Sequence, residues 1–466
     1  MSTLDVSALR TRFAGQVVAP GDPGYDDARA LFYGGHDPRP AVIVRPSGPA
    51  EVADVIALAR ETGLDLSVRC GGHSAAGHSV VDGGIVLDLA HLRAIAVDAG
   101  ERTVWAQAGL TAGDVTAAVA EHGLAVGFGD TGTVGIGGIT TGGGVGYLSR
   151  THGLTIDNVL AAEVVTADGR ILQVDADHHP DLFWAIRGGG GNVGVVTRFQ
   201  YRLHELPGVV GGLILFPATP EVVHGFLREA AAGPEELSVI VNVMPAPPMP
   251  FIPADRHGSL VVLGLVCYAG PADDGEKALA PIRALAEPIA DLVRPIAYPE
   301  MFLSDEDDDH HPTATVRTLF ADELDLGRIA RVVERLRTAP APMRVTQFRP
   351  LGGAISRVAD DATAYAHRGR AFMVNVAAFL DGADTRAERE RWVLDTAAVI
   401  ENGGPGAYVN FLADDGEQRA REAYPGATWE RLTQVKRRYD PGNLFRRNVN
   451  IPPAASAGVD GGQEVE

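Results

Sequence analysis

Half of the residues from Gly127 to Gly146 are glycine, and no other feature of the chain constrains its fold as strongly. Without side chains, another backbone or a flat ligand can approach closely, and exposed N–H groups can bind phosphate oxygens without a lysine. The segment Gly135-Ile136-Gly137 does not continue into the G-x-G-x-x-G dinucleotide fingerprint, because Thr140 stands where the third glycine is required. No Walker lysine is present either. The tract is therefore a dinucleotide cradle of another type or a tight structural crossing.

A histidine flanked by glycines follows a short apolar run earlier in the chain. The segment reads Val68-Arg69-Cys70-Gly71-Gly72-His73-Ser74-Ala75-Ala76-Gly77-His78. Glycines on both sides allow positive φ angles, so the imidazole of His73 can project from a turn wrapped around a flat ligand. A single histidine in such a turn is more often structural. The motif therefore indicates function only together with the other glycine-rich segments.

A third glycine block, 188–191, lies between an expected helix at 178–187 and an expected strand at 193–204. Such a block lets the backbone lie against a planar ligand. Alternatively, it caps the helix and forms a flexible loop.

Size and composition limit the class of protein. With 466 residues the chain is too long for one compact core, which predicts two domains. A net charge of −20 disfavours nucleic acid and anionic membranes as partners. Two cysteines exclude a disulfide framework and a thiolate metal cluster. The chain has no apolar run that could cross a bilayer and no signal peptide at its start, so we expect a cytoplasmic protein.

The pattern of the sequence changes near residue 207. Residues 1–206 combine short strands, tight turns and helices, which predicts an α+β domain. Residues 207–403 predict a second α+β domain, whose mostly antiparallel sheet is covered by helices. Strands are expected at 210–216, 237–244, 259–268, 343–349 and 371–379, and helices at 219–232, 273–287, 325–338 and 384–400. In 404–453 the glycine-rich pattern returns, and we expect disorder in the tail 454–466.

An acidic run with two histidines occupies residues 304–311. Carboxylates and imidazoles can ligate divalent cations, but contiguous acids are more often a solvated loop, and the spacing matches no calcium loop. We therefore expect no metal site.

Seven segments occur in an order that resembles the FAD domain of berberine-bridge-enzyme-like oxidases, in the p-cresol methylhydroxylase (PCMH)/vanillyl-alcohol oxidase superfamily. They are 20–29, 39–45, the His73 motif, 134–146, 150–159, 188–197, and the pair 408–411 and 439–445. The resemblance implies a two-domain α+β fold of the PCMH type. It also implies that 404–453 returns to the FAD-binding domain formed by 1–206, and that 207–403 binds the substrate.

The same resemblance implies how the cofactor is held. FAD is bonded through its 8α-methyl group to a ring nitrogen of His73. Some relatives add a bond from a cysteine, but Thr131 stands at that position here, so we expect a single covalent link with Cys70 packed beside the flavin. The residues expected at the cofactor are Arg69, Cys70, Gly71, Gly72, His73, Ser74, Gly77, His78, Thr131, Gly135, Gly138, Gly142, Gly144, Asn158, Val164, Tyr408, Asn410 and Asn450.

The implied reaction is an oxidation of a small molecule. Flavin accepts a hydride at N5 from a substrate C–H that bears oxygen or nitrogen, and O₂ reoxidises the flavin to give hydrogen peroxide. Tyr408 is the candidate base, which requires that a nearby cation or second hydroxyl lower its pKa from about 10. Alternatively, Tyr408 only contacts the flavin and packs. Tyr365, His367, Arg368 and Asn375 are further polar residues expected on the substrate side.

Two other functions remain open on the same scaffold. One is a flavin-dependent oxygenase or oxidative cyclase of natural-product biosynthesis, which would incorporate oxygen or close a ring. The other is a flavin-binding protein without turnover. The oligomeric state has no signature in the sequence.

Overall fold

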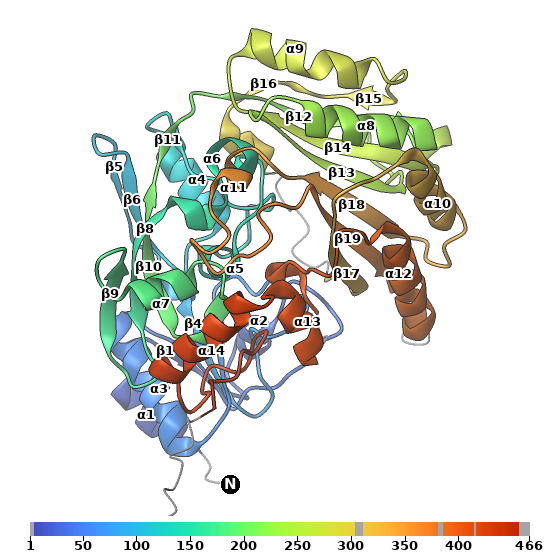
Figure 1. Ribbon diagram of the computed structural model, residues 1–466. Coiled ribbons are helices and arrows are strands. Elements are labelled where there is room, and N and C mark those ends of the chain that lie inside the picture. The colour runs from blue at the N-terminus through green and yellow to red at the C-terminus, as the bar shows by residue number, and fades with distance from the viewer. Residues whose placement is uncertain (1–3, 303–310, 381–384, 414–415, 456–466) are drawn as a thin grey trace, which may run out of the picture.

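The computed structural model describes residues 4–302, 311–380, 385–413 and 416–455. Figure 1 shows two parts, one built on two smaller sheets and the other on a single broad sheet. None of the described helices is long and apolar enough to span a bilayer. Most of the expected tail, from 456 onward, lies outside the described residues.

The first sheet joins four strands near the N-terminus. Its order is β1-β2-β4-β3, with β1 antiparallel and the others parallel. Helix α3 covers the sheet through fully buried Val52, Val55 and Ile56, whose spacing of three and four residues places them on one face of the helix. The bounds are α1 Val6–Arg12, β1 Gln16–Val18, α2 Tyr25–Arg29, β2 Val42–Arg45, α3 Pro49–Thr62, β3 Leu66–Arg69 and β4 Ile85–Asp88.

The second sheet is antiparallel, in the order β5-β6-β10-β8-β9, and β7 pairs with β11 beside it. The glycine tract contains a short helix, α5, just before α6. The bounds are β5 Ile95–Asp98, β6 Thr103–Gln107, α4 Ala112–Ala120, β7 Leu124–Ala125, α5 Ile136–Gly142, α6 Ser149–His152, β8 Val159–Val165, β9 Ile171–Asp175, α7 Pro180–Ile186, β10 Val195–Arg202 and β11 His204–Glu205.

The broad sheet joins eight described strands in the order β15-β12-β14-β13-β18-β19-β17, with β16 also paired to β12. All its pairs are antiparallel, which confirms the predicted sheet. The sequence analysis missed β15, β16 and β17. The bounds are β12 Val209–Pro217, β13 Leu237–Pro245, β14 Leu260–Tyr268, β15 Ala290–Asp291, β16 Arg294–Ile296, β17 Ala314–Ala321, β18 Arg344–Pro350 and β19 Phe372–Phe379.

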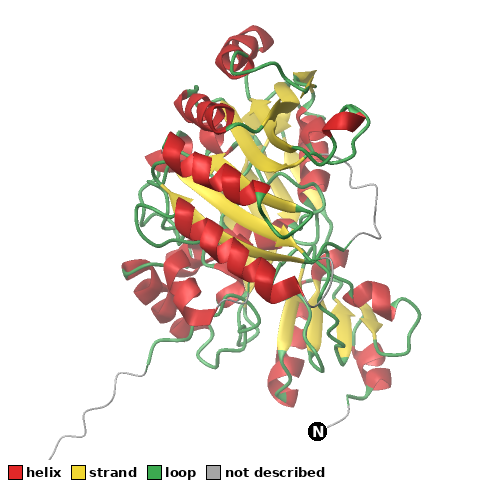
Figure 2. Cartoon of the chain, turned by 90° about the vertical axis from the view of Figure 1, so that its right-hand side faces the viewer, coloured by secondary structure: helices red, strands yellow, loops and turns green. Residues whose placement is uncertain are grey.

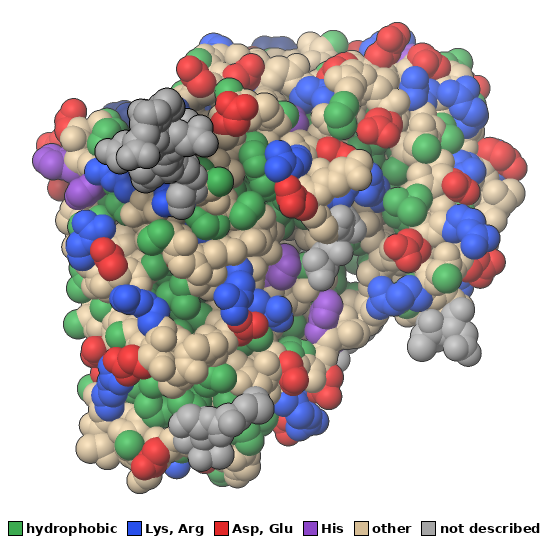
Figure 3. Space-filling view, turned by 60° about the horizontal axis from the view of Figure 1, so that its bottom comes forward, with side chains coloured by type: hydrophobic (Ala, Val, Ile, Leu, Met, Phe, Trp, Pro, Cys, Tyr) green, Lys and Arg blue, Asp and Glu red, His purple; other side chains and the backbone are tan. Residues whose placement is uncertain are grey.

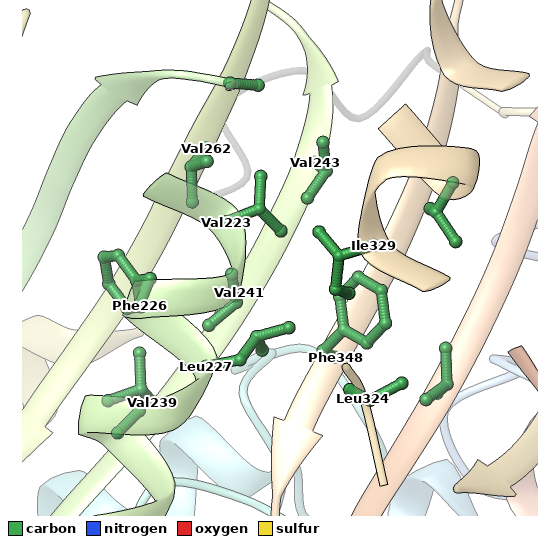
Figure 4. Close-up of a cluster of buried hydrophobic side chains, with 14 of the residues drawn as sticks. Val223, Phe226, Leu227, Val239, Val241, Val243, Val262, Leu324, Ile329 and Phe348 are labelled. Carbon is green, nitrogen blue, oxygen red and sulfur yellow. The ribbon is translucent and has the colours of Figure 1, made fainter. Parts of the chain in front are cut away.

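Helices cover one face of the broad sheet (Figure 2). Alternate residues of β13, Val239, Val241 and Val243, point to these helices and pack with Phe226 and Phe348 (Figure 4). Each such buried side chain contributes about 1.5–3 kcal/mol. The opposite face is therefore free to meet the first part of the molecule. The bounds are α8 Pro220–Ala232, α9 Ala272–Arg283, α10 Leu326–Arg337, α11 Ala354–Arg357 and α12 Arg386–Ile400.

The C-terminal segment packs against the first part. It contains α13, Gly416–Ala423, and α14, Ala427–Tyr439. The fully buried ammonium of Lys436 pairs with Asp440 at 2.7 Å and donates to the carbonyls of Asn192 and Phe445 at 2.8 Å each. Tyr439 donates to Asp181 of α7 at 3.0 Å. The bonds to Asn192 and Asp181 attach the segment to the residue after the third glycine block and to α7 before it.

Candidate cofactor and substrate site

The two glycine-rich motifs cross in direct backbone contact. A Cβ atom added to Gly135 would lie 2.5 Å from the backbone nitrogen of Gly71 and 2.7 Å from the Cβ of Cys70. A Cβ on Gly137 would overlap the sulfur of Cys70. Only glycine allows this approach. The crossing brings the turn after β3 against the first turn of α5.

His73 is held by a ring that the sequence analysis missed. Its half-buried imidazole stacks on Phe32, with centroids 4.2 Å apart and an interplanar angle of 21°. The Phe32 N–H donates to the carbonyl of Gly72 at 3.2 Å, and Gly72 has a φ of +74°. Phe32 lies in the loop after α2, and no local signal in that loop relates it to His73.

The other residues of the His73 motif are engaged within the fold. Arg69 donates to the carbonyl of Ala28 at 2.6 Å, and burial lowers its pKa. Cys70 is a free thiol whose pKa burial raises to about 12, against the opposing effect of the Gly137 and Gly138 N–H groups. Such a thiol is not a reactive thiolate at neutral pH.

The far end of this motif forms a tight turn. The Gly77 N–H donates to the carbonyl of Ser74 at 3.0 Å, with a Gly77 φ of +70°. The ring of His36 packs against Gly77, and its Nε2 lies 3.1 Å from the carbonyl of Ala75. His78 is half-buried in the same turn.

Beyond the crossing, the glycine tract has both open and crowded positions. Gly138 is exposed, and nothing lies within 4 Å of a Cβ added there. In contrast, Gly142 abuts the side chain of Asn410, and Gly144, with a φ of +78°, abuts Thr155. Thr131 is half-buried before α5. A ligand can therefore reach the backbone at Gly138 more readily than at the later glycines.

Tyr408 joins the tract to the C-terminal segment. The side chain is 2% exposed, and its hydroxyl accepts bonds from the Gly144 N–H at 2.9 Å and the Asn410 amide at 3.0 Å. Burial raises its pKa, and these two donors only partly oppose that effect. The lowered pKa that a role as base requires is therefore not met in this arrangement. Tyr408 is a protonated phenol at neutral pH in this arrangement.

Three predicted cofactor residues differ in what they offer. Asn158 uses its whole amide inside the fold, donating to the carbonyls of His152 and Leu154 and accepting from His204. Val164 is fully buried in β8. The Oδ1 of Asn450, in contrast, is buried without a partner, which is expected of a group that faces a ligand.

A polar network crosses from the broad sheet to the glycine tract. The Gln347 amide donates to Asn242 at 2.9 Å, and Arg349 donates to Gln347 at 2.9 Å. Arg349 also reaches Asp130 at 2.7 Å and the carbonyl of Val145 at 3.2 Å. The sequence analysis did not identify this network, because its members lie in three distant segments. Figure 3 shows a hollow between the two parts of the molecule, with histidine side chains at its rim.

Two residues expected on the substrate side, Arg368 and His367, use their side chains for contacts within the fold. Arg368 is 1% exposed and forms two bonds to Asp157 at 2.7 and 3.0 Å. His367 stacks on Phe320 and lies 2.9 Å from the carbonyl of Glu422, and burial lowers its pKa to about 4. It is a neutral imidazole at neutral pH.

FAD fits groups offered by the His73 motif, the glycine tract and the C-terminal segment. His73 offers an imidazole ring that is half-buried. Gly138 offers an open backbone, and Asn450 offers a buried oxygen without a hydrogen-bond partner. Among the described residues, no three His, Cys, Asp or Glu side chains gather as a metal site. Most of the acidic run at 304–311 lies outside them.

Comparison with known proteins adds independent information. Residues 40–175 match the family model "FAD binding domain", and residues 407–452 match "Berberine and berberine like". The chain is 30% identical to (R)-6-hydroxynicotine oxidase of Paenarthrobacter nicotinovorans, over 95% of this chain and 97% of that protein.

Solved structures show the same architecture. The crystal structure of 6-hydroxy-D-nicotine oxidase from Arthrobacter nicotinovorans superposes with a TM-score of 0.83 and 28% identity, covering 95% of this chain and 98% of that one. Xylooligosaccharide oxidase from Myceliophthora thermophila C1, solved with xylobiose, gives a TM-score of 0.83 and 25% identity, covering 97% and 100% of the two chains.

Proposed function

Because the chain belongs to the berberine-bridge-enzyme-like family of FAD-dependent oxidoreductases, we propose that it is an oxidase with FAD bonded to His73. Its substrate is a small molecule oxidised at a C–H that bears oxygen or nitrogen, and its electron acceptor is O₂. The single covalent link follows from Thr131 at the position of the second, cysteine link.

The observation that carries this proposal is the position of His73. The imidazole lies on the turn that meets the glycine tract at the crossing, and Phe32 stacks against it at 4.2 Å. A ring held in this way does not have to lose rotational freedom when a bond forms to it. The half-buried environment still leaves the imidazole accessible to a ligand.

When bound, the flavin supplies a two-electron acceptor for the hydride of the substrate C–H, and O₂ then takes the electrons to give hydrogen peroxide. Oxidation of an alcohol to a carbonyl also releases the hydroxyl proton. Tyr408 is a protonated phenol with two N–H donors on its oxygen, so its own proton is available to position a substrate oxygen. To act as the base, it would first have to lose that proton, which the two donors favour and burial opposes.

Precipitation with acid tests the covalent link. The wild-type pellet should be yellow and carry the added mass of FAD, and a His73→Ala variant should release any flavin into the supernatant. A His122→Ala variant, changed at an exposed histidine, should behave as wild type. Colourless wild-type protein contradicts the proposal. Yellow wild-type supernatant over a colourless pellet would show that the protein binds flavin without a covalent bond to His73.

Peroxide release distinguishes an oxidase from the other reactions of the family. Stoichiometric hydrogen peroxide for each substrate oxidised supports O₂ as the terminal acceptor. Incorporation of ¹⁸O from labelled O₂ into the product would instead indicate an oxygenase.

A further inference from the structure

The side chain of Asn192, the residue after the third glycine block, holds the chain on both sides of Asn450. Its amide nitrogen donates to the carbonyl of Val449 at 3.1 Å, and its Oδ1 accepts from the N–H of Ile451 at 2.9 Å. The same nitrogen donates to the carbonyl of Gly189 at 2.9 Å, and Asn192 is 1% exposed. These three bonds, which we call the Asn192 clamp, fix the backbone on either side of Asn450.

A buried ion pair connects the clamp to the start of the loop that carries Asn450. Lys436 donates to the carbonyl of Asn192 at 2.8 Å and pairs with Asp440 at 2.7 Å, and both charged side chains are fully buried. Asp440 in turn accepts from the N–H groups of Leu444 and Phe445 at 2.8 and 2.9 Å. The loop is therefore held at its beginning through Lys436 and at its end by the clamp itself.

Asn450 is the amide of this region that remains without a hydrogen bond. Asn448 donates to two backbone carbonyls at 3.1 Å each, and Asn410 donates to one carbonyl and to the hydroxyl of Tyr408. In contrast, the Oδ1 of Asn450 is buried without a partner among the described residues, although the residue as a whole is half-buried. Buried polar atoms are nearly always satisfied, so an acceptor held in place without a donor indicates a bound molecule that supplies one.

The clamp lies beside the open part of the glycine tract. The 3-10 turn Gly190–Asn192 contacts α5, the helix of that tract. On the C-terminal side, Val449 and Ile451 pack into the apolar cluster that includes the first residue of α5. Gly138 of α5 is exposed, with nothing within 4 Å of an added Cβ. Asn450 therefore stands between two residues that pack with the tract whose backbone a ligand can reach.

We propose that Asn192 is a positioning residue that holds the Oδ1 of Asn450 as the acceptor for the N3–H of the bound flavin. The inference rests on the proposed function and adds a residue that acts through Asn450 rather than on the flavin itself. An amide oxygen is an acceptor, and the oxidised isoalloxazine ring carries a single N–H group, at N3. Hydrogen bonds to the ring nitrogens are one way in which a protein tunes a flavin.

Two substitutions separate the contact from the clamp. Asn450→Ala removes the acceptor but no hydrogen bond to a described residue, so this variant should fold and retain flavin. Asn192→Ala removes the clamp and leaves Asn450 in the chain. Asn192→Ser makes the same change with a smaller loss of polar volume, and serves if the alanine variant does not retain flavin.

Asn402→Ala is the matched control. Asn402 forms a clamp of the same kind in the other part of the molecule, where its amide nitrogen donates to the carbonyls of Ile400 and Glu323 at 2.9 and 2.8 Å. Its Oδ1 accepts from the N–H groups of Asp322 and Glu323 at 2.8 and 2.9 Å. Loss of this clamp should cost similar stability without an effect on the flavin.

The readout is the ionisation of the flavin N3–H, followed by absorbance of the holoenzyme as the pH is raised. A hydrogen bond to Asn450 stabilises the protonated form, so losing the bond should lower the pKa of this group. We expect Asn450→Ala and Asn192→Ala each to raise its ionisation constant about 3- to 10-fold, and Asn402→Ala to leave it unchanged. The double variant should match Asn450→Ala alone, because both changes remove the same bond.

Three results would overturn the inference. An ionisation constant that Asn450→Ala leaves unchanged would remove Asn450 from the flavin ring. Additive effects in the double variant would show that Asn192 does not act through Asn450. Loss of flavin from both Asn192 variants would assign Asn192 a purely structural role. The acid precipitation and peroxide tests are read independently of these variants, so failure of the positioning role is distinguished from failure of the oxidase.

Discussion

The glycine crossing and the polar row of the broad sheet, formed by Asn242, Gln347, Asn375 and Thr318 in register, are built by opposite means. At the crossing, backbone touches backbone, and a Cβ on Gly135 would lie 2.5 Å from the nitrogen of Gly71. On the sheet, regularly spaced strands present the side chains of Asn375 and Thr318, which can change without moving the backbone. The first side of this comparison therefore depends on absent side chains, and the second depends on which side chains are present. We expect mutations to have larger, less specific effects on the first side.

Gly135→Ala should have the largest effect. The new methyl group would meet the backbone of Gly71 and the Cβ of Cys70, which cannot move independently, so we expect a loss of about 3 kcal/mol of stability together with loss of flavin. Chemical denaturation and flavin content measure this. Gly138→Ala, three residues on, meets open space and should retain stability. Equal damage from both changes would refute the crowding argument.

Arg349→Met should have the next largest effect, because the pair with Asp130 joins the two regions. Arg349 is 5% exposed, and its loss leaves a partly buried carboxylate unpaired, so we expect about 2 kcal/mol of destabilisation. Arg357→Met is the matched control. It breaks an exposed pair with Glu235 and should cost less than about 1 kcal/mol. Similar free energies of unfolding for both variants would show that the pair does not join the regions energetically.

Acid should weaken the protein through histidines outside the crossing. Burial lowers the pKa of His367 to about 4, against 6.5 for an unperturbed histidine. As the pH falls below 6.5 the unfolded chain therefore binds the proton first, and stability decreases between pH 6.5 and about 4. His367→Gln should make this decrease shallower in melts across that range, whereas exposed His122→Gln should not. A slope that His367→Gln leaves intact would assign the acid sensitivity elsewhere, with His204 the next candidate.

Phe32→Ala should have the smallest effect, because it removes one side-chain contact of His73. Stacked aromatic pairs contribute about 0.5–1.5 kcal/mol, so we expect covalent flavin attachment to slow by about 2- to 12-fold. Fluorescence of the denatured protein in a gel, followed over time after FAD is added to apoprotein, measures this rate. Phe32→Tyr keeps the ring and should attach flavin at nearly the wild-type rate. An unchanged rate in Phe32→Ala would leave the stack without a role in attachment.

The sequence predicted helices and strands well where apolar residues recur with the period of a helix or a strand. The helix expected at 219–232 is α8, which begins one residue later, and the strand expected at 237–244 is β13 extended by one residue. Strand β17 was missed because it follows an acidic run, with half-buried residues at its start that give no clean alternation. The short helix α5 was missed because glycine carries no periodic apolar signal.

The site was predictable only where its chemistry is contiguous. The glycine segments and His73 stand out in the sequence, because close approach requires glycine and leaves consecutive marks. The raised pKa of Tyr408 does not meet the condition that a role as base requires. Its burial, with 2% of the side chain exposed, cannot be read from its neighbours in the chain. The side chain of Asn158 was expected at the cofactor, but its hydrogen bonds are made within the fold.

The sequence by itself determined the family, the order of its glycine motifs and the histidine that they expose, because these depend on residues that are adjacent in the chain. Only the tertiary structure decided that Phe32 stacks on His73, that Arg349 reaches Asp130, and that Thr318 and Asn375 stand side by side with unsatisfied polar atoms. These contacts join segments tens to hundreds of residues apart. Burial and strand register, which set their geometry and their energy, exist only once the chain has folded.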